Sequence, residues 1–249
     1  MRLDEYRQIS NQAMDLRIRL GVDATSPVDV FSLASTIDKL TLVKYAFNGN
    51  ISGACMKFPL SNLIVVNTTQ SLGRQRFTLG HELYHLFYDQ TQGNIICAGA
   101  IGKGNPIERK ADLFASLFLV PTAALHSAMV KLGTASRITM LDVLKLEQLF
   151  GISHQAMLIR LSDEGLITKD EQDNLSYGIV NYAMKKGYDT TLYEKNAQPE
   201  SKVLGHYIDI ADNLLSSSFI SEGKYDELLL DAFRDDIVFG NYDMEGLCD

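Results

Sequence analysis

The sequence has little cysteine and no long apolar run. Three cysteines in 249 residues, odd in number and widely spaced, argue against a disulfide framework and are typical of a reducing cytosol. The N-terminal residues are charged and lack the apolar core of a secretory signal. No stretch approaches the length that a membrane-spanning helix requires. We therefore expect a cytoplasmic protein that has no membrane partner.

Positive charge is also scarce. The chain has 23 basic and 31 acidic side chains, and its formal net charge is −8. Residues 221–249 hold nine acidic and two basic residues, so this segment carries −7 of that charge. Such a segment is usually a solvated face, and the alternative is a surface that attracts a basic partner such as a DNA-binding repressor. The acidic balance argues against nucleic acid as a direct ligand.

The sequence does contain His-Glu-x-x-His, inside a run with helical periodicity. Because residues i and i+4 share one face of a helix, His81 and His85 can bind one metal ion together. Glu82 stands beside that face, where a carboxylate can take a proton from water. The alternative is an ordinary polar pair, since the bare pattern also occurs by chance. The chain has only five histidines, and this helix has an apolar opposite face, which favours the metal site.

A catalytic zinc site needs a third protein ligand. Residues 107–121 predict a second amphipathic helix that ends at a proline. Glu108 and Asp112 share a face of it, and we expect one of them to complete the site; the alternative is a solvated face paired with neighbouring basic residues. Ala111 and Ala115 would let the two helices approach closely.

The two motifs together resemble a known family. Arg-x-Arg-Phe-Thr-Leu-Gly-His-Glu-Leu-x-His-Leu at 74–86, followed by Glu-Arg-Lys-Ala-Asp-Leu-Phe-Ala-Ser-Leu-Phe-Leu-Val-Pro at 108–121, is similar to the ImmA/IrrE group of zinc metalloendopeptidases. The chain departs from the family pattern at Gly80, where alanine is usual, at Tyr84, where glycine is usual, and at Val120, where methionine is common. None of these positions is a ligand.

The resemblance implies particular roles for five residues. His81, His85 and Glu108 would bind Zn²⁺, and Glu82 would be the general base of peptide hydrolysis. Asp112 would orient a ligand imidazole through its free N–H. The implied substrate is a helix-turn-helix repressor of a mobile element, phage or stress regulon. The alternative is a toxin component or zinc-stabilised binding module that binds an antitoxin-like partner without proteolysis.

The predicted fold class is α+β, a zincin-like core followed by a mainly helical C-terminal half. Extended runs at 41–47, 51–58 and 62–67 predict three antiparallel strands, and Asn48-Gly49 predicts a tight hairpin between the first two. An edge strand of this sheet would lie above the metal and pair with an extended peptide. Asn67 is therefore a candidate substrate contact, and the alternative is a plain strand end.

We expect three regions: residues 1–125 as the metallopeptidase domain, 126–168 as a helix-turn-helix-like region, and 169–249 as a helical region with an acidic tail. Residues 89–106 predict a long rim or lid of the cleft. For Cys97 within it, the alternatives are a redox or inhibitory ligand and, as for most free cysteines, a small buried hydrophobe.

The phrase at 149–161 resembles a helix-turn-helix, and Ser153 is the expected N-cap of its second helix. A DNA-reading helix needs a basic face, and this one offers only Arg160 beside the polar His154 and Gln155. Packing beside the catalytic domain, or docking of a partner, is the favoured role. His154 is expected to be exposed.

Overall fold

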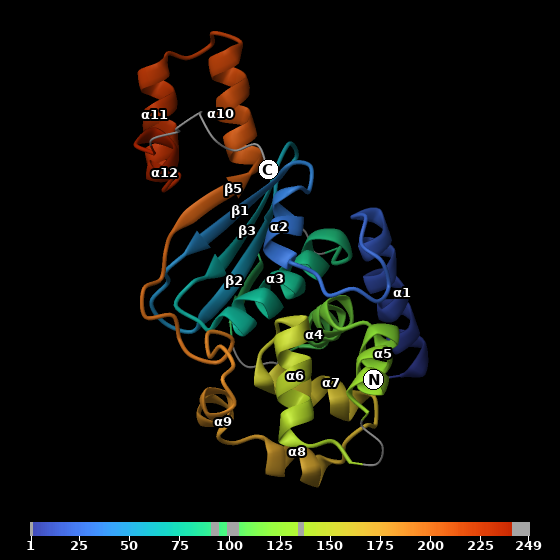
Figure 1. Cartoon of the computed structure of the whole chain (residues 1–249). Helices are drawn as coiled ribbons and strands as arrows, with labels where there is room; N and C mark the ends of the chain where they lie inside the picture. The colour runs from blue at the N-terminus through green and yellow to red at the C-terminus, as the bar shows by residue number, and fades with distance from the viewer. Residues whose placement is uncertain (1, 91–94, 99–104, 134–136, 241–249) are drawn as a thin grey trace.

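The computed structural model describes residues 2–90, 95–98, 105–133 and 137–240 (Figure 1), and within them a mixed sheet lies against a set of helices. The predicted α+β class is confirmed. The strands are β1 Leu40–Tyr45, β2 Ile51–Lys57, β3 Asn62–Asn67, β4 Ile95–Ala98 and β5 Lys202–Gly205. The helices are α1 Leu3–Arg19, α2 Val30–Ser35, α3 Leu72–Phe87, α4 Pro106–Leu119, α5 Thr122–Leu132, α6 Met140–Phe150, α7 His154–Asp163, α8 Lys169–Leu175, α9 Ile179–Lys185, α10 His206–Ser216, α11 Glu222–Asp231 and α12 Asp235–Val238.

The strand order is β4-β2-β3-β1-β5, which corrects the predicted antiparallel meander. β1 does not pair with β2 as a hairpin; it pairs with β3 in parallel, and β2 pairs with β3 antiparallel. β3 can lie between two strands because its run from Ile64 to Val66 is buried, as expected of a central strand. The Asn48-Gly49 turn is therefore part of a wider connection between strands that are not neighbours.

Asn67 holds that connection in place. Its side chain is 1% exposed and donates to the carbonyl of Ile51 at 2.7 Å, while its carbonyl oxygen accepts from Phe47 N and Thr69 N. β3 is thus an inner strand and cannot add a peptide at its edge. The edges of the sheet are β4, which lies in the predicted lid, and β5, which lies in the region predicted to be helical.

The main packing contact is between α3 and α4, where small residues meet. A Cβ placed on Gly80 would lie 3.3 Å from the Cβ of Ala115, so the two helices are already close at this point. Ala111 and Ala115 are fully buried, in agreement with the predicted close approach. Nearby, Phe114 and Phe118 stack with ring centroids 5.7 Å apart and fill the core under the helices.

The boundary between the two helices of the helix-turn-helix-like phrase is as predicted: α6 ends at Gly151 and Ser153 caps α7. The expectation that His154 is exposed is wrong. It is 8% exposed, with Nδ1 2.5 Å from Glu147 and Nε2 2.8 Å from the carbonyl of Leu175. Buried polar groups are hydrogen-bonded because an unpaired group would lose its hydration.

Arg160, the one basic residue of the supposed recognition face, is also fully buried. It donates to the carbonyl of Val120 and to Glu164, so it joins α7 to the segment between α4 and α5. A Cβ on Gly73 would lie 2.6 Å from the amide nitrogen of Ser153, so the start of α7 packs against α3. Helix-turn-helix proteins insert this end of the second helix into the major groove. The favoured packing role agrees with this arrangement.

The C-terminal part of the chain supplies the last strand of the sheet, β5, and then continues into helices. β5 pairs antiparallel with β1, and α10 and α11 project beyond this edge as a helical hairpin (Figure 1). One buried apolar cluster extends from Ile9 to Ile167 and contains residues of the two N-terminal regions expected from the sequence. The division into three regions stays a prediction. Among the described residues no single helix could cross a bilayer, although α4 and α5, bent by 48°, would suffice jointly in length and composition.

Candidate metal centre

Helix α3 carries the His-Glu-x-x-His motif across the middle of the molecule. The side chain of Ser71 accepts from the amide of Arg74 and starts the helix, and every residue from Phe77 to His85 is buried. His85 is fully buried and His81 is 7% exposed. Two imidazoles in such a place need polar partners, because a buried ring nitrogen without one is destabilising.

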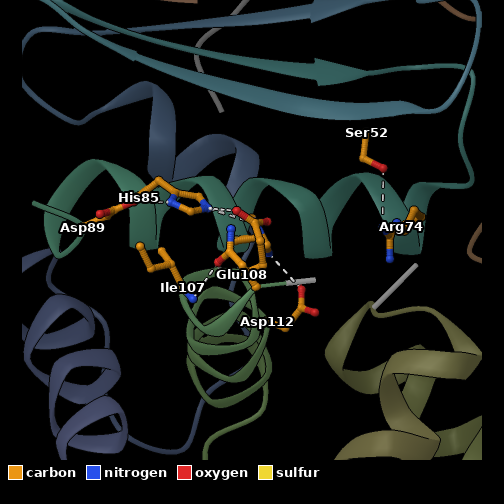
Figure 2. Close-up of polar contacts among 9 residues, drawn as sticks. Ser52, Arg74, His85, Asp89, Ile107, Glu108 and Asp112 are labelled. Atoms are coloured by element: carbon orange, nitrogen blue, oxygen red, sulfur yellow. Dashed lines mark hydrogen bonds and ion pairs between the residues drawn. The ribbon is translucent and has the colours of Figure 1, made fainter. Parts of the chain in front are cut away.

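Helix α4 brings the carboxylates to this face of α3. Asn105 caps its N-terminus by accepting from the amides of Ile107 and Glu108, and Pro106 occupies the first helical position, where its missing N–H has no cost. Glu108 therefore lies in the first turn of α4, at the end that meets α3. Figure 2 shows Glu108 on α4 close to His85 of α3, and Asp112, one turn further along α4, lies within hydrogen-bond distance of His81.

Three side chains converge on one point. Nε2 of His81 lies 3.2 Å from Nε2 of His85 and 3.1 Å from Oε2 of Glu108. Nε2 of His85 lies 3.5 Å from the other carboxylate oxygen, Oε1 of Glu108. The three residues that the sequence placed at zinc are thus neighbours, with their donor atoms turned towards each other.

A second carboxylate holds the far nitrogen of each ring. Nδ1 of His81 lies 2.9 Å from Oδ1 of Asp112, and Nδ1 of His85 lies 2.9 Å from Oδ2 of Asp89 (Figure 2). With Nδ1–H donated to a carboxylate, Nε2 keeps its lone pair for a cation. The sequence reasoning had placed Asp112 here but missed Asp89, which it treated as the start of a loop. The signal was present, because Asp89 follows His85 by four residues.

Glu82 lies on the side of α3 that faces the sheet. It is fully buried, and neither of its carboxylate oxygens makes a hydrogen bond of normal geometry among the described residues, although the thiol of Cys97 is near enough to act on its pKa. Strand β2 passes directly over it at Gly53, where a Cβ would lie 2.9 Å from Oε1 of Glu82 and 2.6 Å from Cγ2 of Thr78. Glycine is required at this position because any side chain would collide with α3.

The electrostatics of the site follow from this burial. Burial raises the pKa of Glu82 to about 7. Burial opposes protonation of His81, but its hydrogen bonds with Asp112 and Glu108 outweigh that effect and raise its pKa to about 9. A pair of imidazoles with four nearby carboxylates is a donor set that a divalent cation would neutralise.

The residues present fit a metal ion. Ligand atoms of His81, His85, Glu108 and Cys97 all lie within 4.8 Å of one another. Imidazole nitrogen and carboxylate oxygen are usual zinc ligands. The carboxylate of Glu82, which lies beside these ligands, can accept a hydrogen bond from a water molecule. The arrangement can therefore bind a Lewis acid and supply a base next to it.

Asn67, Tyr84 and Tyr88 take part in other contacts of the chain. Asn67 is turned to the chain's own backbone, and its role in substrate contact stays a prediction. The ring of Tyr84 packs on Phe114, and the hydroxyl of Tyr88 donates to the carbonyl of Gln12 on α1. Both tyrosines thus have partners in the core or on α1.

Comparison with known proteins agrees with this geometry. Residues 41–162 match the model of a peptidase family, Peptidase M78, described as the IrrE N-terminal-like domain. The match includes β1 to β4, both motif helices and most of α7. A search of curated proteins found no match to the chain.

Proposed function

We propose that this chain, which belongs over residues 41–162 to the IrrE N-terminal-like domain family of metallopeptidases, is a zinc-dependent endopeptidase that cleaves a helix-turn-helix repressor. The observation that carries the proposal is the buried, unpartnered carboxylate of Glu82 beside the convergent donor atoms of His81, His85 and Glu108. A site built only to stabilise the fold would not need Glu82 as a fourth polar group whose oxygens lack a hydrogen bond.

The chemistry divides between the cofactor and the chain. Zinc, when bound, would supply Lewis-acid polarisation of water and of the scissile carbonyl. Glu82 accepts a proton from the attacking water and returns it to the leaving amine. Asp89 and Asp112 keep the two imidazoles in one tautomer and orientation.

The proposed substrate class rests on the family resemblance and on charge. Residues 206–240, which form the projecting C-terminal helices, contain eight acidic and two basic residues. A DNA-binding repressor is basic where it contacts phosphate, so an acidic surface would favour its approach. The described face of α7 offers no exposed basic side chain, and nucleic acid is not proposed as a ligand.

The test combines metal content with cleavage. The native chain and Glu82→Gln are loaded with zinc and incubated with a purified helix-turn-helix repressor. We expect about one zinc ion per chain in both proteins, and a cleavage rate at least about 100-fold lower for Glu82→Gln because the base is lost. Glu200→Gln, which removes an exposed acid outside the acidic surface of residues 206–240, is the matched control and should cut like the native chain.

Two results would contradict the proposal. If the native chain binds no metal, the site has been misassigned. If both proteins hold zinc and bind the partner but neither cuts it, proteolysis is excluded and the chain acts by complex formation, as a toxin component or zinc-stabilised binding module would.

A further inference from the structure

Cys97 lies on β4, the edge strand next to the metal centre. β4 pairs antiparallel with β2, and Cys97 stands opposite Gly53 in the register. The ladder is irregular just before this pair, between Ile51 and Gly53, as is common beside functional sites. Cys97 is 5% exposed, so its thiol is turned into the protein.

The register fixes the direction of that thiol. Residues directly opposite in an antiparallel pair point to the same face of the sheet. At Gly53 this face is the one towards α3, because a Cβ there would meet Glu82 and Thr78. The thiol of Cys97, opposite Gly53, is therefore on the face of the sheet that packs against α3.

The distances between donor atoms independently place the thiol of Cys97 at the candidate metal centre. Sγ of Cys97 lies within 4.8 Å of the ligand atoms of His81, His85 and Glu108. Zinc with three protein ligands keeps a position for water, whereas zinc with four protein ligands, thiolate among them, is closed. A fourth donor in this cluster therefore changes what the site can do before substrate arrives.

We propose that Cys97 is the fourth protein ligand of the resting metal centre and occupies the position that water needs. This inference rests on the proposed function and adds its regulation. Ligation forms one metal–sulfur bond and releases the thiol proton to solvent, so no oxidant or reductant is required. The protease is then latent until Cys97 is displaced, and movement of β4 would displace it.

Cobalt is the probe, because a cobalt–thiolate bond gives a charge-transfer absorption band that nitrogen and oxygen ligands do not give. The full-length chain is loaded with Co²⁺ in place of zinc. We expect the band in the native protein and its loss in Cys97→Ala, with Cys97→Ser as a second variant should the first not fold. Cys55→Ala and Cys248→Ala are the matched controls and should keep the band; Cys55 is fully buried on β2 but outside the cluster.

Cleavage by zinc-loaded Cys97→Ala should be faster than cleavage by the native chain. Bound cobalt without the band, or a band that survives in Cys97→Ala, would overturn the inference and leave the protease intact. A band that disappears together with an unchanged cleavage rate would overturn latency. If the native chain binds no more cobalt than His81→Ala does, the metal centre itself fails, and the proposed function fails with it.

Discussion

At the scale of single residues, the candidate metal centre includes carboxylates that hold the histidines from their far side. His85 is fully buried, and its Nδ1 faces Asp89 at the end of the same helix. Lys57 on β2 donates to the backbone carbonyl of Asp89 at 2.5 Å and anchors this residue to the sheet. The orientation of the imidazole is thus set by α3 and β2 together.

We predict that Asp89→Ala weakens zinc binding by roughly 10- to 100-fold, since loss of a partner to the far nitrogen of a ligand histidine has this size of effect. Competition with a chromogenic chelator measures the affinity. Asp38→Ala, which removes an exposed carboxylate, is the control and should bind like the native chain. Equal affinities for the two variants would mean that Asp89 does not orient His85.

A second residue-scale prediction concerns Glu164, which joins three helices. It accepts from Tyr6 on α1, Thr122 on α5 and Arg160 on α7 at 2.6 to 2.9 Å. Burial acts to raise its pKa, but these hydrogen bonds and the charge of Arg160 prevail and hold the pKa below its usual value. Glu164→Gln should lower the free energy of unfolding by about 2 kcal/mol at pH 7, as for hydrogen bonds to charged groups.

The pH dependence follows from the direction of that shift. A depressed folded-state pKa gives stability that is fully present above the unfolded value of about 4.3 and is lost as the pH falls through the folded value. The difference between native and Glu164→Gln in urea unfolding should therefore shrink between about pH 5 and pH 3. Glu227→Gln, on an exposed pair with Lys224, should change little at any pH. A difference that grew on acidification would exclude this account.

At the scale of elements, the decisive contact is the passage of β2 over α3. Gly53 faces backbone as well as side chains, because a Cβ would lie 2.9 Å from the carbonyl oxygen of Val65. The strand cannot easily yield, since β3 holds it from one side and β4 from the other. The position of Glu82 under the sheet is fixed by this close approach.

Gly53→Ala and Gly223→Ala should therefore have opposite effects. The first should destabilise the chain by about 1–3 kcal/mol through overpacking and should also reduce cleavage. The second lies within α11 with nothing within 4 Å of its would-be Cβ, and alanine there should stabilise by about 0.5–1 kcal/mol. Chemical denaturation of both variants checks the pair, and a stabilised Gly53→Ala would contradict the described packing.

How far the sequence predicts the structure depends on the range of the interactions. The motif helices follow from local spacing, since His81 and His85 need only helical geometry to share a face. The order of the strands does not, because the pairing of β1 with β3 rather than β2 is decided by burial across the sheet. His154 was misjudged for the same reason: its partners Glu147 and Leu175 come from α6 and α8, and an isolated helix gives no sign of them.

At the scale of the whole molecule, the C-terminal region belongs to the fold of the metallopeptidase segment. β5 covers one edge of β1, and Val203 on it is buried and donates from its amide to the carbonyl of Ala232. The family match ends at residue 162, so β5 lies outside it, whereas β1, whose edge β5 covers, lies within it. An uncovered edge is a template for pairing with another chain.

A chain that ends at residue 200 should accordingly associate at high concentration and unfold at least about 5 °C lower than the full chain. Light scattering and thermal unfolding measure the two effects. A chain that ends at residue 240 retains β5 and all described helices and serves as the control. A monomeric 200-residue chain with unchanged thermal stability would show that β5 is dispensable.

The pairing of β5 with β1 also sets an order of events during synthesis. About 160 residues separate the two strands, so at a translation rate of 5–20 residues per second the edge of β1 stays open for roughly 10–30 s after it leaves the ribosome. In that interval both motif helices emerge and can meet, whereas the sheet above them is still incomplete. The nascent chain would thus bring its candidate metal ligands together before β5 covers the edge of β1. Until then, that edge could pair with other chains being made on the same messenger RNA.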